Sequence, residues 1–235
     1  HAVVVDPGDA DVVFRALEAH ALKLDAVLIT HHHNDHIGGL EALVETHPTP
    51  VFAPADPRIP GKVRAVRDGE RITLLGGALL LDVMEVPGHT ETHIAYHGDG
   101  LLFPGDTLFS AGCGRLLGGT AAQLHASLAR LAALPGETQV YPTHEYTLSN
   151  LAFAAHVEPH NAERDDVLSR ARASRSTGEP TLPTTLAVER AINPFLRTTH
   201  AGIRASVQGH LGHEPGDDLT TFTALRAWKD VFQAP

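Results

Sequence analysis

The sequence predicts a mixed α/β protein with a helical C-terminal part. Residues 1–53 alternate between apolar, β-branched runs and stretches whose apolar residues recur at helical spacing. Residues 72–103 hold short apolar runs separated by Gly, Pro and Asp, a pattern typical of antiparallel hairpins. After Tyr146 the pattern is mainly helical. We expect the boundary between these two parts near residue 145.

The N-terminal part predicts a βαβαβ order. Asp6-Pro7-Gly8 is a turn signal that ends the first apolar run. The expected elements are, in order, strand 2–5, helix 9–24, strand 26–29, helix 37–46 and strand 51–53.

The rest of the chain predicts hairpins followed by helices. The segment TGEPTLPTTL, residues 177–186, is expected to be extended, because residues that precede proline disfavour the helical conformation. Strands are expected over 72–75, 78–86, 94–96, 101–103 and 139–141. Helices are expected over 121–134, 148–156, 162–175 and 220–232.

Composition excludes several classes of function. The net charge of −10 counts against nucleic-acid partners, which need a basic face. No apolar run approaches the roughly 20 residues of a membrane span. Cys113 is the single cysteine, so an intrachain disulfide is impossible, and we expect it to be a loop-packing thiol. A single cysteine favours a reducing compartment, so we expect a cytoplasmic protein. We also expect it to be a monomer. The chain begins at His1, without Met and inside a predicted strand, so we expect N-terminal strands to be missing.

The segment LITHHHNDHIGGL holds four histidines and an aspartate within six positions, directly after a predicted strand. If the chain leaves that strand extended, His31, His33 and Asp35 share one side. His32 points the other way, and His36, at the turn into a helix, can aim at a neighbouring point. Two subsets of ligands suggest two metals. Imidazole nitrogen mixed with carboxylate oxygen suits Zn, Fe or Mn rather than Ca or Mg.

Three further polar residues follow predicted strands. His89 lies in EVPGHT, Asp106 in LLFPGDTLF and His144 in VYPTHEYT. Loops just past buried strands are where binding residues usually sit on a rigid scaffold. One bridging carboxylate would let the whole set hold two metals. The predicted metal ligands are His31, His33, Asp35, His36, His89, Asp106 and His144.

These motifs resemble a known family. THHHNDHIGG, PGHT, GDTLF and PTHEYT, in this order, resemble the metallo-β-lactamase superfamily. AGCGR, THEYTLSNLAFA, GEPTLPTTLAVERAINPFLR and RAWKDVF resemble, more narrowly, glyoxalase II, the hydroxyacylglutathione hydrolases. The resemblance runs from Val5 to Phe232. It implies a four-layer αββα sandwich over residues 1–145 and a helical substrate-binding domain over 146–235.

The resemblance also divides the ligands between two metals. It assigns His31, His33 and His89 to one metal, Asp35, His36 and His144 to the other, and Asp106 to the bridge. This places Asp35 with the second metal, whereas the extended-chain geometry groups it with the first. His32 and His93 receive no ligand role, although His93 lies only four residues after His89.

The substrate contacts come from the same resemblance. Arg115 matches a basic residue after the Cys-Gly pair, and Leu117 takes a substrate position that is usually aromatic. Tyr146 matches the tyrosine after the His-Glu pair. Arg226 and Lys229 match two basic residues that hold the carboxylates of glutathione. Their separation of three residues places both on one face of a helix.

The implied reaction is hydrolysis of a glutathione thioester. S-D-lactoylglutathione and related S-2-hydroxyacylglutathiones would yield D-lactate and glutathione, the second step of methylglyoxal detoxification. A hydroxide bridging two metal ions would attack the carbonyl, with Asp106 as the catalytic bridging carboxylate beside it. The expected metals are two divalent ions, Zn first, with Fe or Mn as alternatives.

Other functions remain open at this point. The nearest alternative is a mononuclear-iron persulfide dioxygenase of the same superfamily, a family without the C-terminal helical motifs. A β-lactamase or lactonase needs no glutathione-binding helical region, and a nuclease fits the acidic charge badly. A binding protein with a decayed site is disfavoured, because all seven ligand positions are filled.

Overall fold

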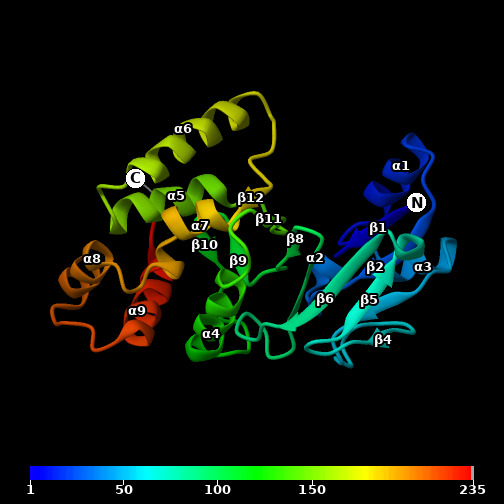
Figure 1. Cartoon of the computed structure of the whole chain (residues 1–235), viewed down its shortest axis with the longest axis horizontal. Helices are drawn as coiled ribbons and strands as arrows, with labels where there is room; N and C mark the ends of the chain where they lie inside the picture. The colour runs from blue at the N-terminus through cyan, green and yellow to red at the C-terminus, as the bar shows by residue number, and fades with distance from the viewer. Residues whose placement is uncertain (234–235) are drawn as a thin grey trace. The chain divides into compact units, whose positions relative to one another are not determined.

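The structure, a computed structural model, describes residues 1–233. The chain forms two compact units. The N-terminal unit comprises His1–Glu85 and Thr92–Gly105, and the C-terminal unit comprises Val86–Glu91 and the chain from Asp106 onward. Figure 1 shows the first mainly in blue and cyan and the second in green to red.

The N-terminal unit holds two sheets. One is parallel, in the order β1 (Ala2–Val5), β2 (Leu24–Leu28), β3 (Val51–Ala53) and β4 (Arg64–Ala65). The other pairs its strands antiparallel, in chain order: β5 (Arg71–Leu74), β6 (Leu79–Glu85), β7 (Ile94–Gly98) and β8 (Leu101–Phe103). The helices are α1 (Ala10–Ala19), α2 (Asn34–Ile37) and α3 (Leu40–Thr46), with a 3-10 turn, η1, over Leu75–Gly77.

Strand β2 is buried on both faces, as strands of parallel sheets usually are. Its residue Leu28 packs with Leu81 and Tyr96 of the antiparallel sheet, while Val27 packs on the opposite face with Leu40. The Tyr96 hydroxyl lies 2.9 Å from the Ile29 carbonyl oxygen and 3.0 Å from that of Phe52. Each of these hydrogen bonds contributes about 1 kcal/mol. Together they join β7 to β3 and to the residue that follows β2, just before the histidine segment.

The C-terminal unit is mainly helical. Its first hairpin joins β9 (Leu108–Phe109) to β10 (Gly112–Cys113), and β11 (Gln139–Val140) pairs antiparallel with β12 (Thr184–Thr185). The helices are α4 (Ala121–Ala132), α5 (Thr147–Val157), α6 (Ala162–Ser176), α7 (Leu186–Ile192), α8 (Ala201–Leu211) and α9 (Asp218–Val231), with a 3-10 turn, η2, over Pro194–Leu196. Helix α9 packs against α4 and α8, and α5 against α6 (Figure 1).

Side-chain caps define where the helices of the C-terminal unit begin. Thr120 and Gln123 form a reciprocal capping box at the start of α4. Asn161 caps α6 and Asp217 caps α9, each by accepting a backbone N–H three residues on. These caps define the residues at which α4, α6 and α9 begin.

A buried carboxylate ties the β9–β10 hairpin to α7. Glu189, fully buried, accepts hydrogen bonds from the Ser110 hydroxyl and the Ala111 N–H in the turn of that hairpin. It also accepts from the Thr184 hydroxyl and the Asn193 amide. Burial raises the pKa of the Glu189 carboxyl above its ordinary 4.5, although these donors oppose the shift. These hydrogen bonds anchor the turn of the β9–β10 hairpin to α7.

Most predicted elements are confirmed, with shifted ends. The helix expected over 9–24 ends at Ala19, because Ala21 adopts a positive φ of 50° and Leu24 already begins β2. The helix expected over 37–46 is two helices, α2 and α3. The extended connector is confirmed, and it contains β12. Strand β4, the hairpin β9–β10 and helices α7 and α8 were not predicted. In residues 1–233 no helix is long and apolar enough to cross a membrane.

The raised pKa of Glu189 makes a prediction about stability and pH. An acid whose pKa is higher in the folded than in the unfolded chain stabilises the fold below its unfolded pKa, near 4.5. That contribution is lost as pH rises through the folded pKa. In Glu189→Gln the side chain cannot ionise, so the free energy of unfolding measured with urea should not show this loss. The free energy of unfolding of the wild type should fall relative to the variant as pH rises above about 4.5; a pH-independent difference would contradict the account.

Candidate metal centre

The histidine segment is extended only as far as His33. That residue has φ −65° and ψ 147°, and helix α2 begins at Asn34. Within the extended part, His31 Nε2 lies 3.0 Å from His33 Nδ1. Asp35 and His36 lie on the helical turn, where Asp35 Oδ2 is 3.9 Å from His36 Nε2. The extended-chain prediction that Asp35 groups with His31 and His33 is wrong, because the helix turns its side chain to another direction.

Asp6 holds two of these histidines from behind. Its Oδ2 lies 2.9 Å from His36 Nδ1 and accepts the Thr30 hydroxyl at 2.7 Å. Because the Thr30 hydroxyl donates to Asp6, it accepts from His31 Nδ1, 3.0 Å away. Both imidazoles then carry their proton on Nδ1 and their lone pair on Nε2. The turn after Asp6 packs tightly here, since a Cβ on Gly8 would lie 2.1 Å from the Asp35 carbonyl oxygen.

Asp6 was predicted only as a turn residue. Its role follows from the parallel pairing of β1 with β2, which places Val5 opposite Leu28 and hence the next residues of each strand together. Asp6 is buried and adopts a positive φ of 49°. The sequence does show a carboxylate at the end of a predicted strand. It does not show which strands are neighbours, so the contact of Asp6 with the histidine segment could not be predicted.

The C-terminal unit places one carboxylate between two imidazoles. Asp106 Oδ2 lies 3.5 Å from His89 Nε2, and Asp106 Oδ1 lies 3.4 Å from His144 Nε2. His89 Nδ1 donates to the Arg115 carbonyl oxygen at 2.8 Å, so its lone pair is also on Nε2. The His144 ring stacks on Tyr146, with centroids 5.0 Å apart. Each oxygen of Asp106 therefore faces a different histidine.

The donor sets of both units fit a divalent metal. Two ligands of one tetrahedral zinc, each about 2.0–2.1 Å from the metal, lie about 3.3 Å apart. The measured separations of 3.0, 3.4 and 3.5 Å are close to that value. The 3.9 Å pair includes Asp35, whose side chain is 61% exposed and has room to adjust. Neutral imidazoles mixed with carboxylates are ligands for Zn, Fe or Mn.

Two histidines of the N-terminal unit lie next to these donors without joining the pairs. His32 Nδ1 is 3.4 Å from the buried carboxylate of Asp56. Burial, and then the positive charge of Arg58, lower the pKa of His32. His93 is buried, and its ring stacks on His31 with centroids 4.6 Å apart. Its ring therefore packs face-to-face against that of a predicted ligand.

Three of the predicted substrate residues are accessible. Arg115 is exposed, and its Nε donates to Asp230 at 3.3 Å. Leu117 is 54% exposed, and its backbone N–H donates to the His89 carbonyl oxygen. Tyr146 is 48% exposed, and its ring meets Phe109 edge-on. Arg115 and Leu117 therefore belong to the same loop that contacts His89.

The two basic residues of α9 differ in environment. The ammonium of Lys229 lies 5.7 Å from the ring centre of Phe153, and burial lowers the pKa of Lys229. Arg226 is only 4% exposed and donates to the carbonyl oxygen of Cys113 at 3.0 Å. The Cys113 thiol is itself buried, which raises its pKa. Although both residues come from one helix, Arg226 faces the chain's own backbone.

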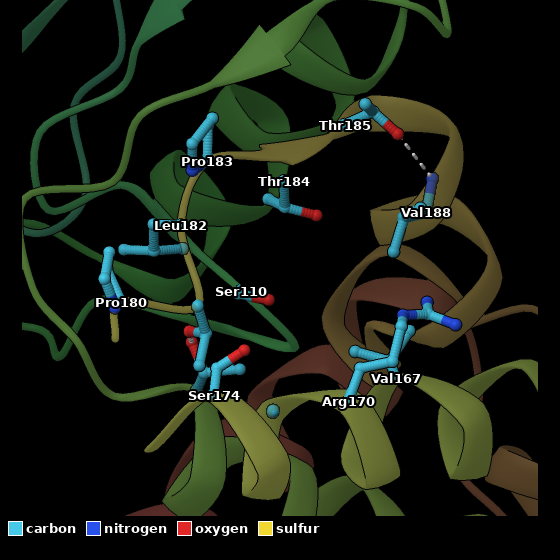
Figure 2. A pocket seen from close by; sticks show the side chains of 13 residues that line it. Ser110, Val167, Arg170, Ser174, Pro180, Leu182, Pro183, Thr184, Thr185 and Val188 are labelled. Carbon is cyan, nitrogen blue, oxygen red and sulfur yellow. Dashed lines mark hydrogen bonds between the residues drawn. The ribbon is translucent and has the colours of Figure 1, made fainter. Parts of the chain in front are cut away.

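A separate cavity lies within the C-terminal unit. It has a volume of about 430 Å³ and is lined by residues of α6, of α7 and of the connector before it (Figure 2). Ser110, Thr147 and Ala171 are its buried lining residues, and Arg170 is its cationic side chain. The lining contains none of the predicted metal ligands or substrate residues. This cavity is therefore distinct from the donor sets described above.

Comparison with known proteins confirms the family that the motifs predict. The family model for the metallo-β-lactamase superfamily matches residues 1–144, and that for the hydroxyacylglutathione hydrolase C-terminus matches residues 145–232. A hydroxyacylglutathione hydrolase of Cupriavidus taiwanensis is 51% identical over 244 residues, covering 99% of this chain and 91% of the relative. That of Photobacterium profundum is 52% identical over 237 residues, with the same coverage of 99% and 91%.

Solved structures confirm the α/β fold class. The crystal structure of ETHE1 from Myxococcus xanthus matches with a TM-score of 0.66 and 28% identity, covering 99% of this chain and 82% of that one. The crystal structure of TTHA1623 in a di-iron-bound form matches with a TM-score of 0.59 and 29% identity, covering 83% and 88%. Matches to both family models, together with about half of all positions identical over nearly the full length, show that this chain belongs to the hydroxyacylglutathione hydrolases of the metallo-β-lactamase superfamily.

Proposed function

We propose that the chain hydrolyses the thioester of S-D-lactoylglutathione and related S-2-hydroxyacylglutathiones. The products are D-lactate and glutathione, and the reaction is the second step of methylglyoxal detoxification. The observation that carries the proposal is the placement of Asp106 with one carboxylate oxygen toward each of two imidazoles. The match of residues 145–232 to the hydroxyacylglutathione hydrolase C-terminus supports the choice of substrate.

The proposed centre holds two divalent metal ions, with zinc first and iron or manganese as alternatives. The pairing of His31 with His33, and of Asp35 with His36, supports a division of the ligands into two sets. The proposed sets are His31, His33 and His89 for one ion, Asp35, His36 and His144 for the other, and Asp106 for both. When bound, such ions lower the pKa of water to near neutral and polarise a carbonyl group.

The chain's own residues prepare the donors for this chemistry. Asp6 and the Arg115 carbonyl oxygen fix the protonated nitrogen of His36 and His89, so that each ring presents a neutral nitrogen. Asp106 is buried, which strengthens its electrostatic interactions by excluding water. No side-chain base is required, because the nucleophile comes from water. The proposed catalytic contribution of Asp106 is to be a ligand of both ions and so to link the two ligand sets.

The proposed contacts with the glutathione part of the substrate come from the loop after β10 and from the C-terminal helices. Arg115, Arg226 and Lys229 supply positive charge for the carboxylates of glutathione. Tyr146 supplies a ring and a hydroxyl. Leu117 offers an apolar contact. These contacts would keep the thioester carbonyl in place and so convert remote binding into orientation.

We assign metal binding to residues 1–145 and substrate binding to residues 146–235. This division by role is supported by the ends of the two family models, at residues 144 and 145. We further propose that the chain acts as a monomer in the cytoplasm. The buried, raised-pKa thiol of Cys113 fits a protein that needs no disulfide.

The test is the rate of S-D-lactoylglutathione hydrolysis, measured on the same sample as the metal content. We expect thioester hydrolysis with about two metal ions per chain, and loss of metal and activity together in Asp106→Ala. One iron per chain with oxygen uptake on a persulfide would instead support the dioxygenase alternative and overturn the proposal. Well-metallated protein that hydrolyses none of several glutathione thioesters would also overturn it.

A second prediction concerns Lys229. Removing one charge-assisted bond to the substrate should raise KM by about tenfold and leave kcat nearly unchanged, because the bond exists in both ground and transition states. Steady-state kinetics of Lys229→Ala measure this directly. Lys62→Ala, which removes an exposed lysine from the N-terminal unit, is the matched control. An unchanged KM in Lys229→Ala would remove Lys229 from the peptide contacts.

A further inference from the structure

We propose that Thr181, in the extended connector, is a positioning residue for the turn over residues 144–147. That turn carries His144, a proposed metal ligand, and Tyr146, a proposed substrate contact. Thr181 acts on them through the two side chains that flank Tyr146. The inference deepens the proposed function, and it rests on that function in taking His144 and Tyr146 as parts of the site.

Thr181 makes polar contacts with the residues on both sides of Tyr146. Its backbone N–H donates to Glu145 Oε2 at 2.8 Å, and its hydroxyl donates to Glu145 Oε1. The Thr147 hydroxyl lies 2.7 Å from the Thr181 hydroxyl and interacts with the same carboxylate. Hydrogen bonds to a carboxylate are about twice as strong as those between neutral groups. One connector residue thus holds both neighbours of Tyr146.

The turn depends on such outside contacts. Glu145 and Tyr146 are exposed, so burial does not fix them, whereas Thr147 is buried. Tyr146 occupies the N-cap position of α5, where Ser, Thr, Asp or Asn is preferred because a short side chain can accept from the first N–H groups. A long aromatic side chain does not take that role. Contacts from elsewhere in the fold are therefore needed to fix the start of α5.

The connector faces a cavity where it meets this turn. Residues 180–185 line one side of the 430 Å³ cavity, and α6 lines another (Figure 2). A segment that faces a cavity has fewer apolar contacts on that side, so polar bonds carry more of the work of fixing it. Two connector threonines supply such bonds. Thr181 bonds Glu145, and Thr184 donates to the buried Glu189 at 3.0 Å.

His144 and Tyr146 are positioned together because their rings stack. The ring centroids are 5.0 Å apart, and the ring planes are inclined by 25°. Both rings also meet Phe109 edge-on, with centroids 5.9 Å away for His144 and 5.2 Å away for Tyr146. A shift of the peptides around Tyr146 therefore changes the direction of the imidazole as well as the place of the tyrosine ring.

The informative substitution is Thr181→Val, which keeps the branched shape and the backbone N–H but removes the hydroxyl. The Glu145 carboxylate then loses a donor, and the buried Thr147 hydroxyl loses the oxygen 2.7 Å away. Because unsatisfied buried polar groups are costly, we expect the turn to shift toward new partners. His144 and Tyr146 should move with it.

The first measurement is the proton NMR signal of the His144 ring in the zinc-loaded full chain. The ring current of Tyr146 shifts this signal, and Tyr146→Leu gives its value without that ring. We expect Thr181→Val to move the signal toward the Tyr146→Leu value, and Thr181→Ser, which keeps the hydroxyl, to retain the wild-type position. If Thr181→Val does not fold, Glu145→Gln decides the outcome, because it disturbs the same bonds. An unmoved His144 signal would overturn the proposal.

The second measurement is zinc affinity, by competition with a chromophoric chelator. Removing outer contacts that orient metal ligands typically weakens binding by about 10–100-fold. Thr181 acts through a neighbouring residue, so we expect the lower end, about tenfold weaker binding of at least one zinc ion in Thr181→Val. The matched control is Thr184→Val, the same change on the same connector. Equal weakening in the control would assign the effect to a general loosening of the connector and overturn the proposal.

A double-mutant cycle tests whether Thr181 acts through Glu145. Residues of one hydrogen-bond network are not additive, so Thr181→Val should weaken zinc binding little further in a chain that already carries Glu145→Ala. Fully additive losses would contradict this route.

None of these measurements needs a substrate, so the two proposals fail separately. Thioester hydrolysis in the wild type, with an unmoved His144 signal and wild-type zinc affinity in Thr181→Val, would refute the positioning role alone. A displaced signal and weakened zinc binding in that variant, while the wild type hydrolyses no glutathione thioester, would refute the proposed function alone.

Discussion

The proposed site depends on the Asp106 carboxylate facing one imidazole with each of its two oxygens. Of the two side-chain types in this set, only the carboxylate has two equivalent oxygen donors and can serve two ions at once. The preceding Gly105 adopts a φ of +51°, and a Cβ there would lie 2.4 Å from the Thr30 hydroxyl. The turn after β8 therefore packs directly on the residue that supports His31.

The imidazoles are held in place by bonds to their far nitrogens. In the N-terminal unit Asp6 supports His36 directly and His31 through Thr30. In the C-terminal unit the Arg115 carbonyl oxygen supports His89. Each support selects the neutral tautomer that binds metals and restricts rotation of the ring. The centre is thus built as much by a strand end and a loop as by the donors themselves.

Part of this arrangement could be predicted from the sequence. Each proposed donor follows an apolar run, so strand ends and residue types together were enough to select the candidates. The grouping of Asp35 could not be predicted locally, because it depends on α2 starting at Asn34 rather than later. Asp6 required knowledge that β1 and β2 are parallel neighbours. Arg226 was selected by the family resemblance, and neither that resemblance nor its spacing from Lys229 indicates that its side chain is only 4% exposed.

The β9–β10 hairpin and helix α7 were not predicted, for physical reasons. Strands β9 and β10 contain two residues each, too few for an apolar alternation to show. Helix α7 follows the proline-rich connector at once, and its start depends on the Thr185 side chain accepting from the Val188 N–H. Tertiary bonds to Glu189 then fix both elements, and such bonds between distant residues leave no periodic pattern in the sequence.

X-ray absorption of the zinc-loaded chain tests the central claim of a two-metal centre most directly. The account predicts nitrogen and oxygen ligands at about 2.0–2.1 Å and zinc–zinc scattering at about 3.5–4 Å, at a loading of two ions per chain. A single zinc per chain at saturation, with no second metal in its scattering, would contradict it.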